Sequence, residues 1–114
     1  MSNVSFLGIN EKTATFKKGA NVKAGEPVSV TGSFTVGGCA STDSICGVAV
    51  SVSEDCAGVQ ISGYVRLKYT GTAPGVGYQL LKPNGTGGVT VGTGGLSKLV
   101  IDVDTANSIV GFML

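Results

Sequence analysis

The chain has 114 residues and contains no histidine and no tryptophan. Without histidine it lacks the side chain that most often acts as a general base near neutral pH. No serine, cysteine or threonine stands beside a base in a recognisable catalytic motif. The absence of tryptophan also weakens the case for a sugar-binding site, which usually displays exposed aromatic rings. We therefore expect no enzymatic activity, no catalytic residue and no cofactor.

Charge is scarce as well, since Asp, Glu, Lys and Arg make up 13% of the chain and the net charge is +1. Globular proteins average about 25% charged residues. A nucleic-acid-binding protein would show a basic stripe, so we expect no nucleic-acid partner. The longest apolar runs fall well short of the ~18 residues of a membrane span. The first residues also lack the pattern of a signal peptide, which predicts synthesis in a cytoplasm and no membrane partner.

Cysteine is present in an odd number, at Cys39, Cys46 and Cys56. At least one of them cannot pair within the chain. In a reducing compartment we expect thiols that act as small apolar side chains, with a Cys39–Cys46 loop disulfide as the alternative. The missing histidine and the absence of a C-x-x-C spacing argue against a metal site.

Alternating hydrophobicity is the main signal that the sequence does carry. Valines alternate with small residues over 47–52, and apolar residues alternate with polar ones over 59–69. The polar segment 53–58 between them ends in glycine, so the stretch 47–70 predicts a β-hairpin. We expect Val48, Val50 and Val52 to face the core. The opposite face would carry the following side chains: Gln60, Ser62, Tyr64, Arg66 and Lys68.

The rest of the chain repeats this pattern of short strands and turns. No segment has apolar residues at helical spacing, and the 19 glycines fall mostly at turns between apolar runs. Strands are predicted at 13–17, 27–36, 78–82, 86–93, 98–103 and 108–114. Eight to ten short strands at this spacing predict an all-β fold, a small single-domain β-barrel or β-tulip-like sandwich.

Two groups of polar side chains have the spacing of a site. Asp102 and Asp104 would share one face of a strand, where they could form a catalytic pair or a cation site but are more typical of a polar outer face. Tyr64, Arg66 and Lys68 would share another face, either as a ligand or subunit contact or as an ordinary exposed surface.

Several segments together resemble the capsid decoration, or cement, proteins of tailed phages. The resemblance covers roughly residues 20–114, and no single segment carries it. The segments are Val22–Val28, Ile45–Ala49, Ala57–Val65, Thr72–Gly77, Val100–Asp104 and Ile109–Leu114.

This resemblance implies a β-domain that docks on the outer surface of an expanded phage capsid. Its partner would be the major capsid protein. The docked domain would bridge capsid subunits as a homo-oligomer, with a trimer favoured. It would have no catalytic residues. The protein would be made in the cytoplasm of the host bacterium and end in the virion. Residues 1–16 would be a capsid-binding arm or, alternatively, the first strand, and residues 17–114 the barrel domain. The contact residues of the arm would be the apolar Val4, Phe6, Leu7 and Ile9, which could add a strand to a sheet edge on the capsid, and Tyr64, Arg66 and Lys68 would be further capsid or subunit contacts.

Other functions remain open at this point. A tail-tube or fibre domain would share the fold and the virion location, and a β-sandwich carbohydrate-binding module would share the fold. A lipoyl-type carrier barrel is a further alternative, because 22–28 is similar to lipoyl-domain turns. Such carriers need a lysine at a hairpin tip, and the tip of the predicted hairpin carries Glu54 and Asp55 instead.

Overall fold

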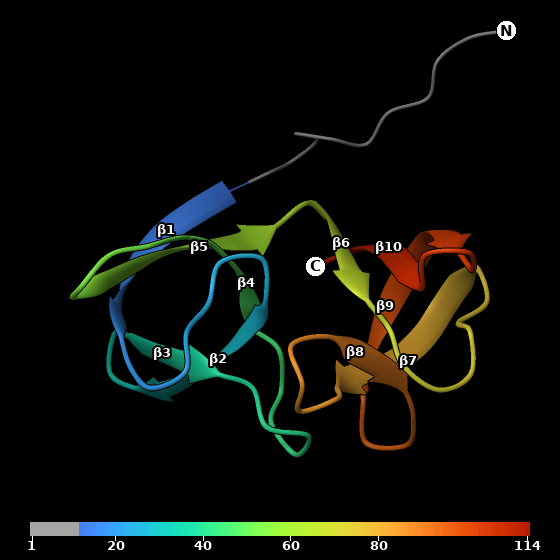
Figure 1. Cartoon of the computed structure of the whole chain (residues 1–114), viewed down its shortest axis with the longest axis horizontal. Helices are drawn as coiled ribbons and strands as arrows, with labels where there is room; N and C mark the ends of the chain where they lie inside the picture. The colour runs from blue at the N-terminus through green and yellow to red at the C-terminus, as the bar shows by residue number, and fades with distance from the viewer. Residues whose placement is uncertain (1–11) are drawn as a thin grey trace, which may run out of the picture.

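The computed structural model describes residues 12–114, and every regular element in that range is a β-strand (Figure 1). The all-β prediction is confirmed. The ten strands are β1 (Lys12–Lys18), β2 (Pro27–Gly32), β3 (Thr35–Gly38), β4 (Gly47–Val52), β5 (Cys56–Ser62), β6 (Tyr64–Lys68), β7 (Gly77–Pro83), β8 (Val89–Val91), β9 (Leu96–Asp104) and β10 (Ile109–Met113). Within the described range no helix is long and apolar enough to span a membrane.

The first five strands form a closed barrel in the order β1-β3-β2-β4-β5. All pairings are antiparallel except that of β1 with β3, which is parallel and joins only two residue pairs. Small apolar side chains fill this barrel, which suits a five-stranded sheet of narrow diameter. The buried members are Val28, Val36, Ala49, Ala57 and Val59, with Phe16, Val22 and Cys46 packed against them.

The last five strands form a second sheet in the order β6-β10-β9-β7-β8. The sheet curls so far that its two edge strands approach each other. Tyr69, just after β6, forms a parallel bridge with Val89 of β8, and the N–H of Thr70 donates to the carbonyl of Val89. The curled sheet thus encloses its own apolar interior, beside the barrel in Figure 1.

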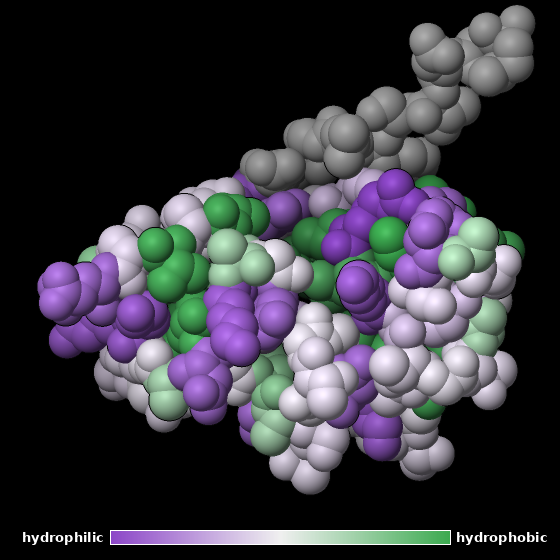
Figure 2. Space-filling model, viewed as in Figure 1, coloured by the Kyte–Doolittle hydropathy of each residue, from purple (hydrophilic) through white to green (hydrophobic). Residues whose placement is uncertain are grey.

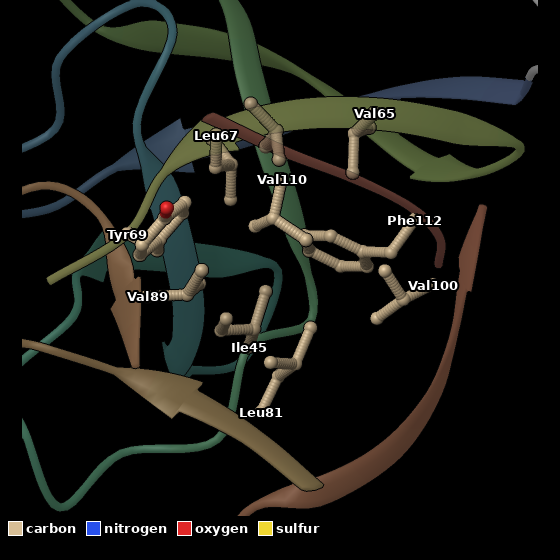
Figure 3. Packing of buried hydrophobic residues seen from close by; sticks show 10 residues of the cluster. Ile45, Val65, Leu67, Tyr69, Leu81, Val89, Val100, Val110 and Phe112 are labelled. Carbon is tan, nitrogen blue, oxygen red and sulfur yellow. The ribbon is translucent and has the colours of Figure 1, made fainter. Parts of the chain in front are cut away.

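Two residues from the barrel half complete the core of the second sheet. Ile45 lies in the loop before β4 and Val48 lies in β4, and both pack among the buried residues of the second sheet (Figure 3). The other members of this cluster are Val65, Leu67, Tyr69, Leu81, Val89, Val100, Val110 and Phe112. Because this core draws on both halves, we treat the described chain as one folding unit with two sheets.

The predicted hairpin exists as β4 and β5, but its valine face is not buried as expected. Val48 is buried, whereas Val50 and Val52 are 48% and 37% exposed. The reason is that Ala49, and not the valines, points into the barrel, while Val48 points outward and is covered by the second sheet. A β-bulge follows, because Ala49 pairs with Val59 and Ser51 pairs with Gly58, so Val50 is an extra residue. A bulge shifts the alternation of all side chains that follow it.

The second half of the predicted hairpin is divided between the two sheets. Gly63 has a φ of +96°, which bends the chain out of the barrel and into β6. Gln60, expected on the outer face, is buried, because its Nε2 donates to the carbonyls of Ser62 and Tyr64 on both sides of this bend. Ile61 is exposed instead.

Two predicted turns also differ in detail. The strand expected over 27–36 is a hairpin, because Phe34 has a positive φ and reverses the chain between β2 and β3. The turn expected at Asn84-Gly85 is a longer loop, closed by a bond from the N–H of Asn84 to the carbonyl of Gly88. The Asn84 side-chain oxygen holds it by accepting from the N–H groups of Thr86 and Gly88.

The beginning and end of the described chain lie close together. Lys12 pairs with Ser62. The N–H of Leu114 donates to the carbonyl of Gly63, the residue that follows Ser62. Residues 12–16 of the segment 1–16 therefore belong to the barrel as part of β1. The possible arm contacts Val4, Phe6, Leu7 and Ile9 lie outside the described residues.

Candidate interaction surface

Tyr64, Arg66 and Lys68 lie together on the outer face of β6, as their i, i+2 spacing predicts. Arg66 and Lys68 are exposed, and Tyr64 is half-buried. The alternate residues of the strand, Val65 and Leu67, are buried in the core of the second sheet. We use "outer face" for this side of the second sheet, which continues across β10, β9 and β7.

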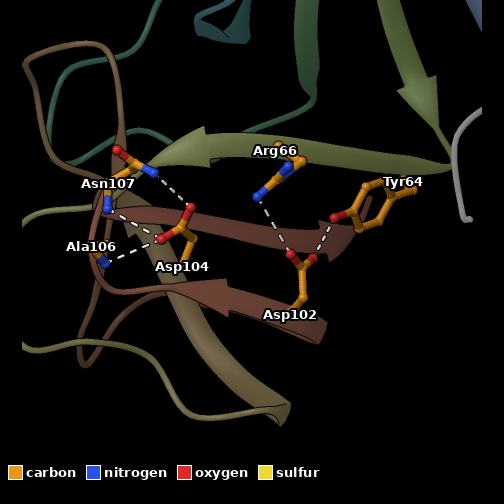
Figure 4. A network of polar contacts seen from close by, with 6 residues as sticks. All are labelled: Tyr64, Arg66, Asp102, Asp104, Ala106 and Asn107. Atoms are coloured by element: carbon orange, nitrogen blue, oxygen red, sulfur yellow. Dashed lines mark hydrogen bonds and ion pairs between the residues drawn. The ribbon is translucent and has the colours of Figure 1, made fainter. Parts of the chain in front are cut away.

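A polar group crosses the outer face above the central strand β10. The hydroxyl of Tyr64 donates to Oδ1 of Asp102, and Nη2 of Arg66 lies 3.5 Å from Oδ2 of the same carboxylate (Figure 4). Asp102 belongs to β9, two strands away, so the contact passes over β10 at Gly111. A Cβ at position 111 would overlap both Asp102 and Tyr64. The glycine therefore makes this contact possible.

The environment of Tyr64 raises its pKa to about 12. Partial burial is the main cause, because it disfavours the charged phenolate. The hydrogen bond to Asp102 and the negative charge of that carboxylate act in the same direction, and Arg66 opposes them. Tyr64 is thus a neutral donor at physiological pH. Because Arg66 and Asp102 are nearly half exposed, their ion pair adds little stability and serves mainly to fix orientation.

Asp104 has a local structural role at the end of β9. Its Oδ1 accepts from the N–H groups of Ala106 and Asn107, and its Oδ2 accepts from Nδ2 of Asn107 (Figure 4). These bonds, those of Asn107 above all, lower the pKa of Asp104. The carboxylate thus holds the turn between β9 and β10, whereas Asp102 contacts Tyr64 and Arg66.

Apolar side chains continue the outer face on β7 and β9, and the sequence analysis did not identify them as contacts. Tyr78 and Leu80 are 74% and 46% exposed, and Val76 precedes them in the loop. Tyr78 pairs with Leu99 of β9, which places Leu99 on the same face. The sequence signal that could have identified this surface is the i, i+2 spacing of Tyr78 and Leu80, which alternate with the buried Leu81.

Hydrophobic residues are also exposed on the barrel half, but they are less organised. Phe34 is 81% exposed at a hairpin turn, and Val30, Val50 and Ile61 are exposed on three different strands. In the view of Figure 2, groups of hydrophobic residues are separated by hydrophilic and neutral ones. The outer face of the second sheet differs, because it carries both exposed apolar residues and a hydrogen-bonded polar group.

A groove of about 580 Å³ lies where the two halves meet. Its walls come from the turn at Ala24–Glu26, from β6 and from the Asn84–Gly88 loop. Glu26, Arg66 and Lys68 all line it, so it carries both signs of charge. Polar side chains of mixed charge in an open groove do not define a ligand class.

The three cysteines are thiols and lie away from the outer face. Burial raises the pKa of Cys39 to about 11, and a hydrogen bond with Ser29 opposes this shift. Cys39 packs against the core of the second sheet, whereas Cys46 packs against the core of the barrel. Among residues 12–114 no three Cys, Asp or Glu side chains gather as a metal site would require.

Comparison with known proteins adds no family. No protein-family model matches the chain, and no curated protein is similar enough to count as a relative.

Proposed function

We propose that this protein is a non-enzymatic structural component of a virion that binds the outer surface of an expanded phage capsid and bridges its subunits. The resemblance in sequence suggests this class. The observation that supports it best is the outer face of the second sheet, which carries both the exposed Tyr78 and Leu80 and the Tyr64–Asp102–Arg66 group.

The composition of this face suits protein binding. Interfaces are enriched in tyrosine and arginine, and such residues contribute most when they are held in place before binding. Tyr64 and Arg66 are both oriented by Asp102 in the free protein. The face is also carried by a sheet whose reverse side is the larger core, so it should change little in shape on docking.

A capsid would strengthen weak contacts through repetition. A homo-oligomer that touches several identical sites gains avidity, because each further contact is intramolecular once the first has formed. A few exposed side chains per copy would then suffice to bridge neighbouring capsid subunits.

Co-sedimentation with expanded, empty capsids tests the proposal. We expect the wild-type protein to pellet with such capsids and to raise their melting temperature. The Tyr78→Ser/Leu80→Ser variant should lose most of this binding, since it removes apolar area from the outer face. Phe34→Ser is the matched control, because Phe34 is even more exposed than Tyr78 and Leu80 but lies on the barrel half. Failure of the wild type to pellet or to stabilise capsids would refute the proposal.

Deletion of residues 1–10 tests the arm that the resemblance implies. We expect the truncated protein to lose capsid binding while its circular dichroism spectrum still shows a β-fold. The described pairing of β1 begins at Lys12, so the deletion leaves that pairing intact. Unchanged capsid binding by the truncated protein would show that residues 1–10 are not the capsid-binding arm.

A further inference from the structure

The loop between β7 and β8 begins with Asn84, which is followed directly by Gly85. Asparagine is one of the thermolabile side chains. A following glycine leaves the asparagine amide open to attack by the main chain, because glycine has no Cβ. Gly85 is exposed and has a φ of +81°, a conformation that favours glycine. The loop thus places an unhindered main-chain nitrogen next to the Asn84 side chain.

The side-chain carbonyl of Asn84 is held by donors from its own loop. The N–H of Thr86 lies 2.8 Å from Oδ1, and the Thr86 hydroxyl and the N–H of Gly88 each lie 3.0 Å from it. At the other end of the amide, Nδ2 donates to Oγ1 of Thr70. Donors aimed at a carbonyl oxygen stabilise the negative charge that develops there when a nucleophile attacks the carbon. The loop is therefore arranged to favour attack on Cγ of Asn84.

The main-chain nitrogen of Gly85 is the nucleophile that the chain supplies for this carbon. Within residues 12–114 its N–H donates to no acceptor, whereas the N–H groups of Asn84, Thr86 and Gly88 are all hydrogen-bonded. Because Gly85 is exposed, water or hydroxide can reach this N–H and remove its proton.

We infer that Asn84 reacts with Gly85 in the folded protein and that the contacts of Oδ1 promote this modification. The Gly85 nitrogen attacks Cγ of Asn84 and forms an N–Cγ bond. The Cγ–Nδ2 bond breaks, and Nδ2 leaves as ammonia with a proton that replaces the one lost from Gly85. Water then opens the resulting succinimide. Hydrolysis of the N–Cγ bond gives aspartate, and hydrolysis of the bond to the main-chain carbonyl carbon gives isoaspartate.

Isoaspartate would change the loop, because it adds a Cβ atom to the main chain. The loop is closed by the bond from the N–H of Asn84 to the carbonyl of Gly88. Gly88 lies against the end of β6, where a Cβ would overlap the Lys68 carbonyl. A longer main chain cannot keep both contacts, so β8, which begins at Val89, should be held less firmly. This inference does not depend on the proposed function, because the reaction needs only the chain and water.

Peptide mapping by mass spectrometry tests the inference on the folded, full-length protein, incubated at mildly alkaline pH. We expect the peptide with Asn84 to lose ammonia and then to gain water. Asn107 is the internal control, because its Nδ2 is also hydrogen-bonded, to Asp104, but Ser108 follows it instead of glycine. Asn107 should remain unmodified while Asn84 reacts, and equal rates at the two asparagines would overturn the inference.

Thr86→Val tests whether the contacts of Oδ1 promote the reaction. It keeps the N–H donor and the branched shape and removes the hydroxyl donor. The rate at Asn84 should fall by about fivefold, the equivalent of one net hydrogen bond. Where this variant fails to fold, the rate in the folded wild type is compared with the rate in urea and should be the higher of the two. An unchanged or higher rate in Thr86→Val, or a folded rate no higher than the unfolded one, would overturn the inference.

The effect on the loop is measured on the isoaspartate form, separated by ion exchange. Asn84→Asp is the matched control, because it carries the same charge without the added main-chain atom. We expect the isoaspartate form to melt at a lower temperature than Asn84→Asp. Equal melting temperatures would overturn the predicted loosening of β8.

Discussion

Gly111 is the residue on which the polar part of the outer face depends. It sits in the central strand between Arg66 and Asp102, and both pair with it directly. Any side chain at this position would occupy the space in which the Tyr64 hydroxyl meets the Asp102 carboxylate. One missing side chain thus links residues that are 38 positions apart.

Tyr64 should make the protein sensitive to alkaline pH. Its pKa is about 12 in the folded protein, against about 10 in an unfolded chain. The unfolded state therefore loses this proton first, and the free energy of unfolding should fall as the pH rises from 10 to 12. Urea unfolding at a series of alkaline pH values measures the effect.

Spectrophotometric titration of the tyrosines provides the control. Asp102→Asn removes the carboxylate charge but not the burial, so the pKa of Tyr64 should fall part of the way toward 10 and remain above it. A Tyr64 that titrates near 10 in the wild type would contradict the geometry in Figure 4.

Gly63 is the point at which the chain passes from one sheet to the other. Its φ of +96° lies in a region that residues with a Cβ rarely adopt. We expect Gly63→Ala to lower the free energy of unfolding by about 1–2 kcal/mol. Thermal and urea unfolding both report this loss.

Gly94→Ala is the matched comparison for Gly63. Gly94 has a φ of +90° with open space around it, in the turn before β9, so its substitution measures the backbone cost alone. A Gly63→Ala loss well above that of Gly94→Ala would show that the bend also orients the two sheets. Equal stability of Gly63→Ala and the wild type would contradict the described bend.

The strands themselves could be predicted from the sequence, whereas their division into sheets could not. Period-two patterns identified the regions of β1, β7, β9 and β10, because alternation is a local property. The bulge at Val50 depends on how β4 aligns with β5, which no pattern within β4 reveals. A glycine inside an apolar run can mark a bulge, a bend or a close backbone approach, so Gly63 alone did not indicate a change of sheet.

The candidate surface was predictable to a similar extent. Spacing placed Tyr64, Arg66 and Lys68 on one face, as observed. Their partner Asp102 depends on β10 lying between β6 and β9, and strand order is not a local property. The exposure of Tyr78 could not be predicted without knowing which face of β7 is buried. Only the packing of Leu81 in the core shows that.

The two halves should unfold together, because the core of the second sheet includes side chains from the barrel half. Ile45 is 6% exposed and packs in that core from the loop before β4. We expect Ile45→Ala to lower the free energy of unfolding by about 2–4 kcal/mol. Calorimetry should still record a single transition, shifted to lower temperature.

An exposed residue in the loop before β7 serves as the comparison for Ile45. Val76 is 68% exposed, so Val76→Ala should change the free energy of unfolding by no more than about 0.5 kcal/mol. Two separate transitions in the wild type would show that the halves fold independently and that the shared core does not couple them.

Lys12 and Leu114 bind two adjacent residues, Ser62 and Gly63, so a short linker could join the two ends of the described chain. Paired strands lie about 5 Å apart, so a linker from Leu114 to Lys12 would cross a gap on the order of 10–15 Å. Residues 1–11, extended at ~3.3 Å each, exceed that length. A circularly permuted chain could therefore keep every strand pairing and open instead at the Glu54–Asp55 tip. Cargo fused at that tip would project from the barrel end, away from the outer face.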